Sequence, residues 1–86
     1  MFTRTVTVGA ASGLHARPAM LVTQAAAASG ARVTIARPSG APVDASSILF
    51  VMGLDVKHGE QVELACDDED VLDRLARMLA TDLDAQ

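Results

Sequence analysis

The sequence predicts one α+β domain, spanning residues 1–86, in which three helices cover one face of a four-stranded sheet. Two patterns support this prediction: some segments place apolar residues at every second position, and others repeat them every three or four positions. The segments follow one another in the order β-α-β-β-α-β-α. Amphipathic helices of this kind need an apolar surface to cover, and one face of the sheet supplies it.

The opening third of the chain predicts a strand and a helix. Threonines alternate with larger side chains in the first strand, which is typical of a β-branched, half-buried segment: Phe2, Arg4, Val6 and Val8. A loop over residues 9–13 leads into a helix over residues 16–28, whose single proline lies near its start, where proline is tolerated. The helix carries one candidate buried stripe, formed by Ala19, Val22, Thr23 and Ala26.

The middle of the chain predicts two strands and a short helix. Val33 and Ile35 alternate with less apolar neighbours in the second strand, and a turn at residues 38–40 leads to a short strand at Val43. Pro42 indicates an edge strand, because proline cannot donate a hydrogen bond to a neighbouring strand. The apolar run ILFVM then predicts a short helix that Gly53 ends and that Ser46 or Ser47 caps.

The last third predicts a strand and an amphipathic helix. Apolar residues alternate over residues 62–66, which makes Cys66 a buried free thiol. Four acids at residues 67–70 precede the helix, where the helix dipole favours negative charge. Apolar residues spaced by four, from Val71 to Leu83, mark its buried face, and the i, i+4 spacing of Asp73 and Arg77 predicts an ion pair.

Composition excludes several classes of function. The net charge is −4 and the pI is about 4.8, so the chain lacks the basic surface that nucleic acids require. We find no apolar run long enough for membrane insertion and no secretory signal, and we expect a cytoplasmic protein. The acids at residues 67–70 lack an ordered ligand spacing. We therefore expect neither a metal nor a cofactor.

The segment GLHARP, from Gly13 to Pro18, is the most informative part of the sequence. His15 falls at or beside the N-cap of the predicted helix, where its ring is exposed and the N–H groups of Ala16 and Arg17 have no helical partner. Such a terminus favours anions and disfavours the positively charged ring, which leaves a ring nitrogen free to act as a nucleophile. A phosphoryl group on that nitrogen would be stabilised by those N–H groups and by the Arg17 guanidinium.

The residues alone leave one other role for His15 open and argue against two more, those of a metal ligand and of a catalytic residue in an enzyme. An exposed cap residue without chemistry is the simplest alternative. His58 lies far along the chain, in a turn, where we expect a surface residue rather than a partner in a metal site. No second acid or base lies near His15 in the sequence, and a domain of this length has little room for a substrate pocket, so we do not expect an enzyme.

The segment GLHARPA, from Gly13 to Ala19, resembles the active-site motif of the HPr family, the histidine-containing phosphocarriers of the bacterial sugar phosphotransferase system. The family's second signature, a serine followed by a short apolar helix and a glycine, is similar to SILFVMGL at residues 47–54. The distance between the two segments agrees with the family apart from what looks like one extra residue in the turn at residues 38–42. The resemblance covers nearly the whole chain.

The resemblance implies an open-faced α+β sandwich and a role in a phosphoryl relay. It implies that Enzyme I, which draws phosphate from phosphoenolpyruvate, phosphorylates His15 on Nδ1 and that the phosphoryl group then passes to a histidine of an EIIA domain. Arg17 matches the family arginine that supports the phosphoryl group. We expect a monomer that carries phosphate without being an independent catalyst.

Large side chains near His15 predict a docking surface for these partners. The predicted surface comprises Met20, Leu21, Gln24, Leu49, Phe50 and Met52. Methionine side chains adapt to several partners, and a relay needs a small and weak interface. In the alternative interpretation, the residues from the short helix cover the edge of a core formed by Ile48, Val51 and Leu54.

Ser47 matches the position that a regulatory kinase phosphorylates in some family members. A phosphate there would add about −1.5 to −2 charges inside the docking surface. Ser46 and Phe50 depart from the regulated members, which often carry lysine and glycine at these positions. Ser47 therefore keeps two interpretations, an N-cap or a regulatory site. An HPr kinase/phosphorylase or a transcriptional regulator stays open as a partner, and a regulatory or nitrogen-branch homologue stays open as an alternative function.

Overall fold

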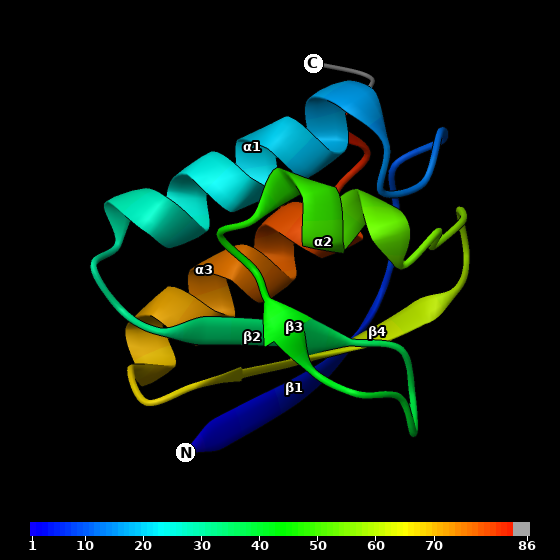
Figure 1. Ribbon diagram of the computed structural model, residues 1–86. Helices are drawn as coiled ribbons and strands as arrows, with labels where there is room; N and C mark the ends of the chain where they lie inside the picture. The colour runs from blue at the N-terminus through cyan, green and yellow to red at the C-terminus, as the bar shows by residue number, and fades with distance from the viewer. Residues whose placement is uncertain (84–86) are drawn as a thin grey trace.

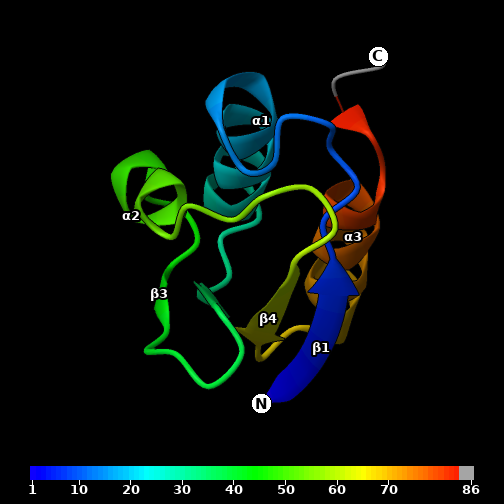
Figure 2. The same cartoon turned by 90° about the vertical axis from the view of Figure 1, so that its right-hand side faces the viewer.

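The computed structural model describes residues 1–83 and contains the predicted elements in the predicted order. They are β1 (Phe2–Thr7), α1 (Ala16–Ala28), β2 (Val33–Ala36), β3 (Val43–Asp44), α2 (Ile48–Gly53), β4 (Gln61–Cys66) and α3 (Glu69–Ala80). The helices lie on one side of the sheet, with α1 between α2 and α3 (Figures 1 and 2). The open-faced α+β architecture is therefore confirmed.

The sheet has the strand order β1-β4-β2-β3, and each neighbouring pair is antiparallel. The strand that comes last in the chain, β4, thus lies in the middle of the sheet and pairs with β1 on one side and β2 on the other. The short strand β3 follows Pro42 and forms one edge. The edge position that the proline predicts is confirmed.

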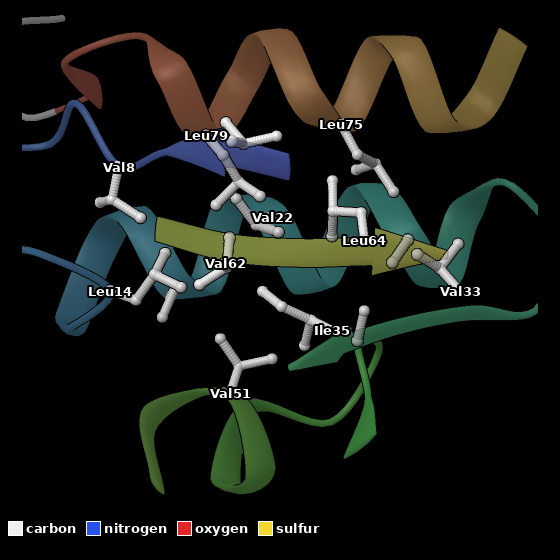
Figure 3. Packing of buried hydrophobic residues seen from close by; sticks show 14 of the residues in the cluster. Val8, Leu14, Val22, Val33, Ile35, Val51, Val62, Leu64, Leu75 and Leu79 are labelled. Atoms are coloured by element: carbon white, nitrogen blue, oxygen red, sulfur yellow. The ribbon is translucent and has the colours of Figure 1, made fainter. Parts of the chain in front are cut away.

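The core lies between the sheet and the helices. Val62, Leu64 and Cys66 of β4 are fully buried, and Leu64 pairs across the sheet with Ile35 of β2. Val62, Leu64 and Ile35 belong to the same buried cluster as Leu75 and Leu79 of α3 and Val22 of α1 (Figure 3). The period-two pattern therefore places the predicted strand residues in the core, and Cys66 is the buried free thiol that the sequence predicts.

Helix α3 begins with the predicted acidic cap and packs its leucines on the sheet. The Asp68 carboxylate accepts hydrogen bonds from the N–H groups of Asp70, at 3.0 Å, and Val71, at 3.3 Å. The helix ends at Ala80, so the apolar stripe continues beyond it: Leu83 is buried, although it lies outside the helix. The helical spacing therefore predicts the burial of this residue but not its backbone conformation.

The predicted ion pair between Asp73 and Arg77 is wrong, because Asp73 pairs across the fold with Arg4 of β1. The Arg4 Nε atom lies 3.1 Å from Asp73 Oδ1, and its Nη2 atom lies 2.9 Å from Glu69 Oε2. Arg4 occupies a position on the helix-covered face of β1, next to the start of α3, and its guanidinium reaches both carboxylates. The pairs hold the edge strand β1 against α3.

Candidate functional site

His15 is the N-cap residue of α1, as the sequence predicts. Its backbone is extended, with φ −127° and ψ 163°, and its side chain makes no hydrogen bond to the helix that it precedes. The first helical hydrogen bond runs from the Ala19 N–H to the His15 carbonyl, at 3.5 Å, and Pro18 has no N–H. The ring is 38% exposed, and Ala16 and Arg17 beside it are also exposed. The ring and the positive end of the helix dipole thus meet at the surface.

Ala16 directly follows His15 and has an unusual backbone conformation. Its φ is +46°, in the left-handed region that residues with a β-carbon rarely adopt. Such a residue costs about 1–3 kcal/mol and persists only where its surroundings hold it. Leu14, which precedes His15, is buried in the core, and Pro18 and Ala19 lie on the buried face of α1. The backbone on both sides of His15 is therefore fixed by packing.

The loop before His15 is joined to the loop after α2 by a backbone hydrogen bond. The Leu14 N–H donates to the Val56 carbonyl at 2.9 Å. Gly13 allows this approach, because a β-carbon at that position would lie 2.4 Å from the Val56 carbonyl oxygen and 2.9 Å from the Lys57 Cα. Gly13 also has φ +76°, which glycine adopts without strain. A glycine two residues before His15 therefore lets two distant segments of the chain approach each other.

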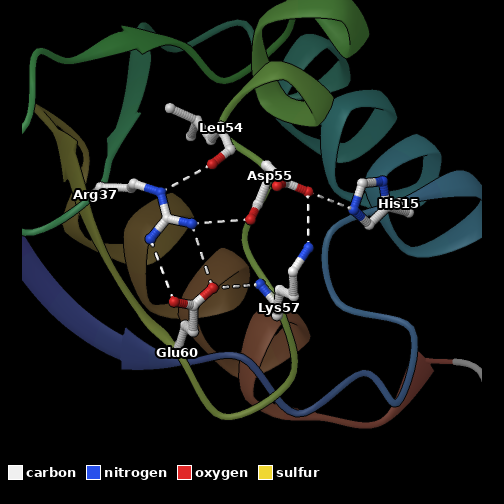
Figure 4. Close-up of polar contacts among 6 residues, drawn as sticks. All are labelled: His15, Arg37, Leu54, Asp55, Lys57 and Glu60. Atoms are coloured by element: carbon white, nitrogen blue, oxygen red, sulfur yellow. Dashed lines mark hydrogen bonds and ion pairs between the residues drawn. The ribbon is translucent and has the colours of Figure 1, made fainter.

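The joined loops bring a carboxylate to the His15 ring. His15 Nε2 lies 3.3 Å from Asp55 Oδ1, and Lys57 Nζ lies 3.1 Å from the same oxygen (Figure 4). The expectation that no acid or base accompanies His15 is therefore wrong. Asp55 is far from His15 in the sequence, and its approach depends on the contact between the two loops, for which the sequence carries no local signal.

The short helix α2 ends at Gly53, as the sequence predicts. The left-handed conformation falls two residues later, on Asp55, with φ +52°. The Asp55 N–H donates to the Met52 carbonyl at 3.0 Å, which satisfies one of the last carbonyl groups of the helix. Aspartate tolerates this conformation better than most residues do. The turn aims the Asp55 side chain at α1.

Arg37, which directly follows β2, supports the loop that carries Asp55. Its Nε atom donates to the Leu54 carbonyl at 2.9 Å, and its Nη2 atom donates to the Asp55 carbonyl at 2.8 Å. Its guanidinium also pairs with Glu60, with Nη2 3.3 Å from Oε1. The same Glu60 oxygen accepts a hydrogen bond from the Lys57 N–H at 2.8 Å. The loop is thus fixed from both ends by one arginine and one glutamate (Figure 4).

The carboxylates of this network are stabilised in their charged forms. The pKa of Asp55 is lowered, chiefly by the hydrogen bond and the charge of Lys57 and to a smaller extent by His15. The pKa of Glu60 is lowered, chiefly by the hydrogen bond from the Lys57 backbone and then by the one from Arg37. Both groups therefore carry negative charge at neutral pH.

The predicted docking residues are mostly exposed. Leu49 is 80% exposed and Phe50 58%, and Met20, Gln24 and Met52 are exposed as well.

The alternative interpretation of α2, in which Ile48, Val51 and Leu54 form a core, holds only in part. Val51 is fully buried and Leu54 packs against the core, but Ile48 is exposed. The prediction that Ile48 belongs to the core is therefore wrong. Ile48 is instead a further exposed apolar residue of α2, which the sequence did not identify. The large exposed apolar side chains of α1 and α2, two helices that pack against each other, are taken together as the apolar surface: Met20, Ile48, Leu49, Phe50 and Met52.

Leu21 differs from the other predicted docking residues. It is half-buried and lines a shallow hollow together with Arg74 and Met78 of α3. Neighbouring residues on a helix point about 100° apart, so Leu21 faces α3 while Met20 lies on a different side of α1. Leu21 therefore lies apart from the apolar surface formed with α2.

Ser47, rather than Ser46, caps α2. Its Oγ atom accepts a hydrogen bond from the Phe50 N–H at 3.4 Å, and its side chain is half-buried. Ser46 instead donates to Asp44 from its hydroxyl, at 2.7 Å, and from its backbone N–H, at 2.9 Å. The pKa of Asp44 is lowered, chiefly by the hydroxyl of Ser46. The capping role of Ser47 is thus confirmed, and its phosphorylation stays a prediction.

The described residues, 1–83, contain no group of three or more histidine, cysteine or acidic side chains that could hold a metal ion. His58 lies on the surface, as expected, with its Nδ1 atom 3.3 Å from the Ala10 carbonyl. None of the helices within this part of the chain has the length and apolar character that crossing a membrane requires.

Comparison with known proteins gives a consistent result. A family model described as "PTS HPr component phosphorylation site" matches residues 2–81. The phosphocarrier protein HPr of Streptomyces coelicolor is 48% identical over 98% of this chain and 94% of its own length. HPr of Haloferax volcanii is 42% identical over 91% of this chain and 92% of its own. The crystal structure of HPr from Bacillus anthracis superposes with a TM-score of 0.85 at 31% identity, covering 91% of this chain and 95% of that one.

Replacing Gly13 with alanine tests whether the loop contact requires a glycine. We expect Gly13→Ala to lower the free energy of unfolding by about 1–3 kcal/mol, because of its left-handed backbone and the collision with Val56. Gly30→Ala is the matched control, since Gly30 has φ +73° but a β-carbon added there would meet no atom within 4 Å. Urea unfolding measures both variants. Equal losses in the two would contradict a special requirement for close approach at Gly13.

The Glu60 network predicts a pH-dependent stability. Because the pKa of Glu60 is lowered in the folded protein, its carboxylate stabilises the fold fully above the ordinary value of 4.5 and loses this effect as the pH falls through the folded-state pKa. We therefore expect Glu60→Gln to destabilise the protein near neutral pH and to differ progressively less from the wild type below about pH 4.5. Urea unfolding over a pH series checks this, and a difference that is constant with pH would contradict it.

Proposed function

The chain belongs to the HPr family of phosphocarrier proteins, and we propose that it accepts a phosphoryl group on His15 from Enzyme I and passes it to a histidine of an EIIA domain. One observation carries this proposal. His15 is an exposed N-cap residue whose Nε2 atom faces Asp55, so its Nδ1 atom lies on the side turned away from that carboxylate (Figure 4). Transfer between proteins needs a nucleophile that both partners can reach.

The chemistry of the proposed transfer needs little from this chain beyond presentation of the ring. The lone pair of Nδ1 attacks phosphorus, and the bond from phosphorus to the donor breaks, with the donor keeping the electron pair. The phosphoryl oxygens then face the start of α1, where the helix dipole and the Arg17 guanidinium favour negative charge. The reverse displacement delivers the group to the acceptor and restores the free ring. The carrier is therefore regenerated without a substrate pocket of its own.

We assign partner docking to the apolar surface of α1 and α2. Leu49 and Phe50 are exposed on α2, which packs against α1, and Met20 is exposed on α1. Exposed apolar side chains of this size bind another protein surface by removing it from water. A small patch suits a relay, because Enzyme I and the EIIA domain must use it in turn and each must leave. The proposed place of action is the cytoplasm, where the family operates.

Phosphorylation of His15 is tested by intact mass. After incubation with phosphoenolpyruvate, Mg²⁺ and the Enzyme I of the same organism, we expect one acid-labile phosphate on the wild type and none on His15→Ala. His58→Ala, which removes the other histidine, is the matched control and should accept phosphate normally. Because the His15 side chain is partly exposed, its loss should cost less than about 1 kcal/mol in unfolding free energy. Phosphate on His15→Ala would overturn the assignment.

Docking is tested with the two phenylalanines of the chain. We expect Phe50→Ala to raise the KM for this protein in the Enzyme I reaction about tenfold, because Phe50 offers a large exposed ring beside His15. Phe2→Ala is the control, since Phe2 is also exposed but lies in β1. Circular dichroism should show both variants folded. An unchanged KM for Phe50→Ala, or an equal effect of both changes, would remove Phe50 from the interface.

A further inference from the structure

We propose that Asp55 is a positioning residue for His15, whose carboxylate holds the ring hydrogen on Nε2 and so keeps the lone pair of Nδ1 available for phosphorus. This inference rests on the proposed phosphocarrier function and concerns the same site. The GLHARP motif contains His15 and Arg17, whereas Asp55 comes from the other of the two joined loops.

The contact between the two side chains has a direct chemical consequence. A neutral imidazole has one nitrogen that donates a hydrogen bond and one that accepts, whereas an ionised carboxylate can only accept. Because Nε2 lies 3.3 Å from Asp55 Oδ1, the hydrogen bond requires the tautomer with hydrogen on Nε2. Figure 4 shows the second ring nitrogen turned away from Asp55. Nδ1 is then the nitrogen that carries the free lone pair.

Asp55 is ionised and held in place, as a positioning residue must be. Its pKa is lowered, chiefly by Lys57 and then by His15, so the carboxylate is charged at neutral pH. Its backbone has a left-handed conformation, with φ +52°, and Arg37 fixes that conformation by donating to the carbonyl groups of Leu54 and Asp55. A strained residue that several hydrogen bonds maintain at a reactive group is typical of a functional site.

The carboxylate also compensates charge during transfer. When the Nδ1 lone pair forms the bond to phosphorus, the ring becomes formally positive while the hydrogen stays on Nε2. Asp55 faces that hydrogen and offsets the new charge, as the aspartate of a Ser-His-Asp triad does for its histidine. When the bond from Nδ1 to phosphorus breaks toward the acceptor, the electron pair returns to Nδ1 and the neutral tautomer is restored. Lys57 shares the same carboxylate oxygen, so the compensation is partial.

The decisive experiment reads the ring tautomer in unphosphorylated protein, and therefore needs no Enzyme I. Two-bond ¹H–¹⁵N spectra of histidine-labelled protein, recorded where the ring is neutral, distinguish a hydrogen on Nε2 from one on Nδ1. We expect the wild type to hold it on Nε2 and Asp55→Gly to gain population with it on Nδ1. Glycine suits the backbone at φ +52°, so the loop should keep its shape. Asp67→Gly, which changes an exposed acid between β4 and α3, should leave the spectrum unchanged.

A second variant and a rate give independent readouts. Asp55→Asn keeps the shape of the side chain but can donate a hydrogen bond to Nε2, so it should shift the hydrogen toward Nδ1 further than Asp55→Gly does. With Enzyme I, both variants should lower the maximal rate of phosphoryl acceptance about tenfold at an unchanged KM. An unchanged tautomer in both variants, or a shifted tautomer with an unchanged maximal rate, would overturn the positioning role. A wild type that accepts no phosphate would instead overturn the proposed function, while the spectra still decide the tautomer.

Discussion

The backbone hydrogen bond from Leu14 to Val56, at 2.9 Å, joins the loop that presents His15 to the loop that presents Asp55. Each loop contains a residue with a left-handed backbone conformation near this contact, Gly13 in one loop and Asp55 in the other. On the inner side of the contact, Leu14 and Val56 are buried in the core. The packing of the domain therefore sets the distance between ring and carboxylate, because buried residues anchor the two loops that present these groups.

The small size of the core also accounts for the exposed apolar side chains of α2. The helices cover one face of the sheet, and the large side chains that remain on α2 have no core position to occupy, which leaves Leu49 and Phe50 exposed. In the proposed relay, an exposed apolar surface suits repeated, short-lived contacts with other proteins. The partner would then supply the catalytic groups that a hydrolase needs in a pocket. On this proposal, the chain contributes a nucleophile, a positive helix end and a surface to bind.

The sequence predicts the elements well because periodicity is local: the bounds of α1 and the buried positions of β4 follow from residue spacing alone. His15 and its N-cap position are likewise local features of GLHARP. Contacts between distant segments could not be predicted in this way, since they depend on how the elements pack. Asp55 beside His15 and Arg4 beside Asp73 are of this kind, and both replace an expectation drawn from sequence neighbours. Leu83 is an intermediate example: the apolar spacing predicts that its side chain is buried, but it lies beyond the end of the helix that the same spacing predicts.

We infer that the contact between the two loops leaves Nδ1 of His15, and not Nε2, open to phosphorus. The one-bond coupling between ³¹P and ¹⁵N, measured in histidine-labelled protein after phosphorylation by Enzyme I and phosphoenolpyruvate, tests this directly. We expect a coupling to Nδ1 of His15, with the hydrogen retained on the nitrogen that faces Asp55. A coupling to Nε2 would mean that the ring leaves Asp55 in order to react, and the loop contact would then not select the nitrogen.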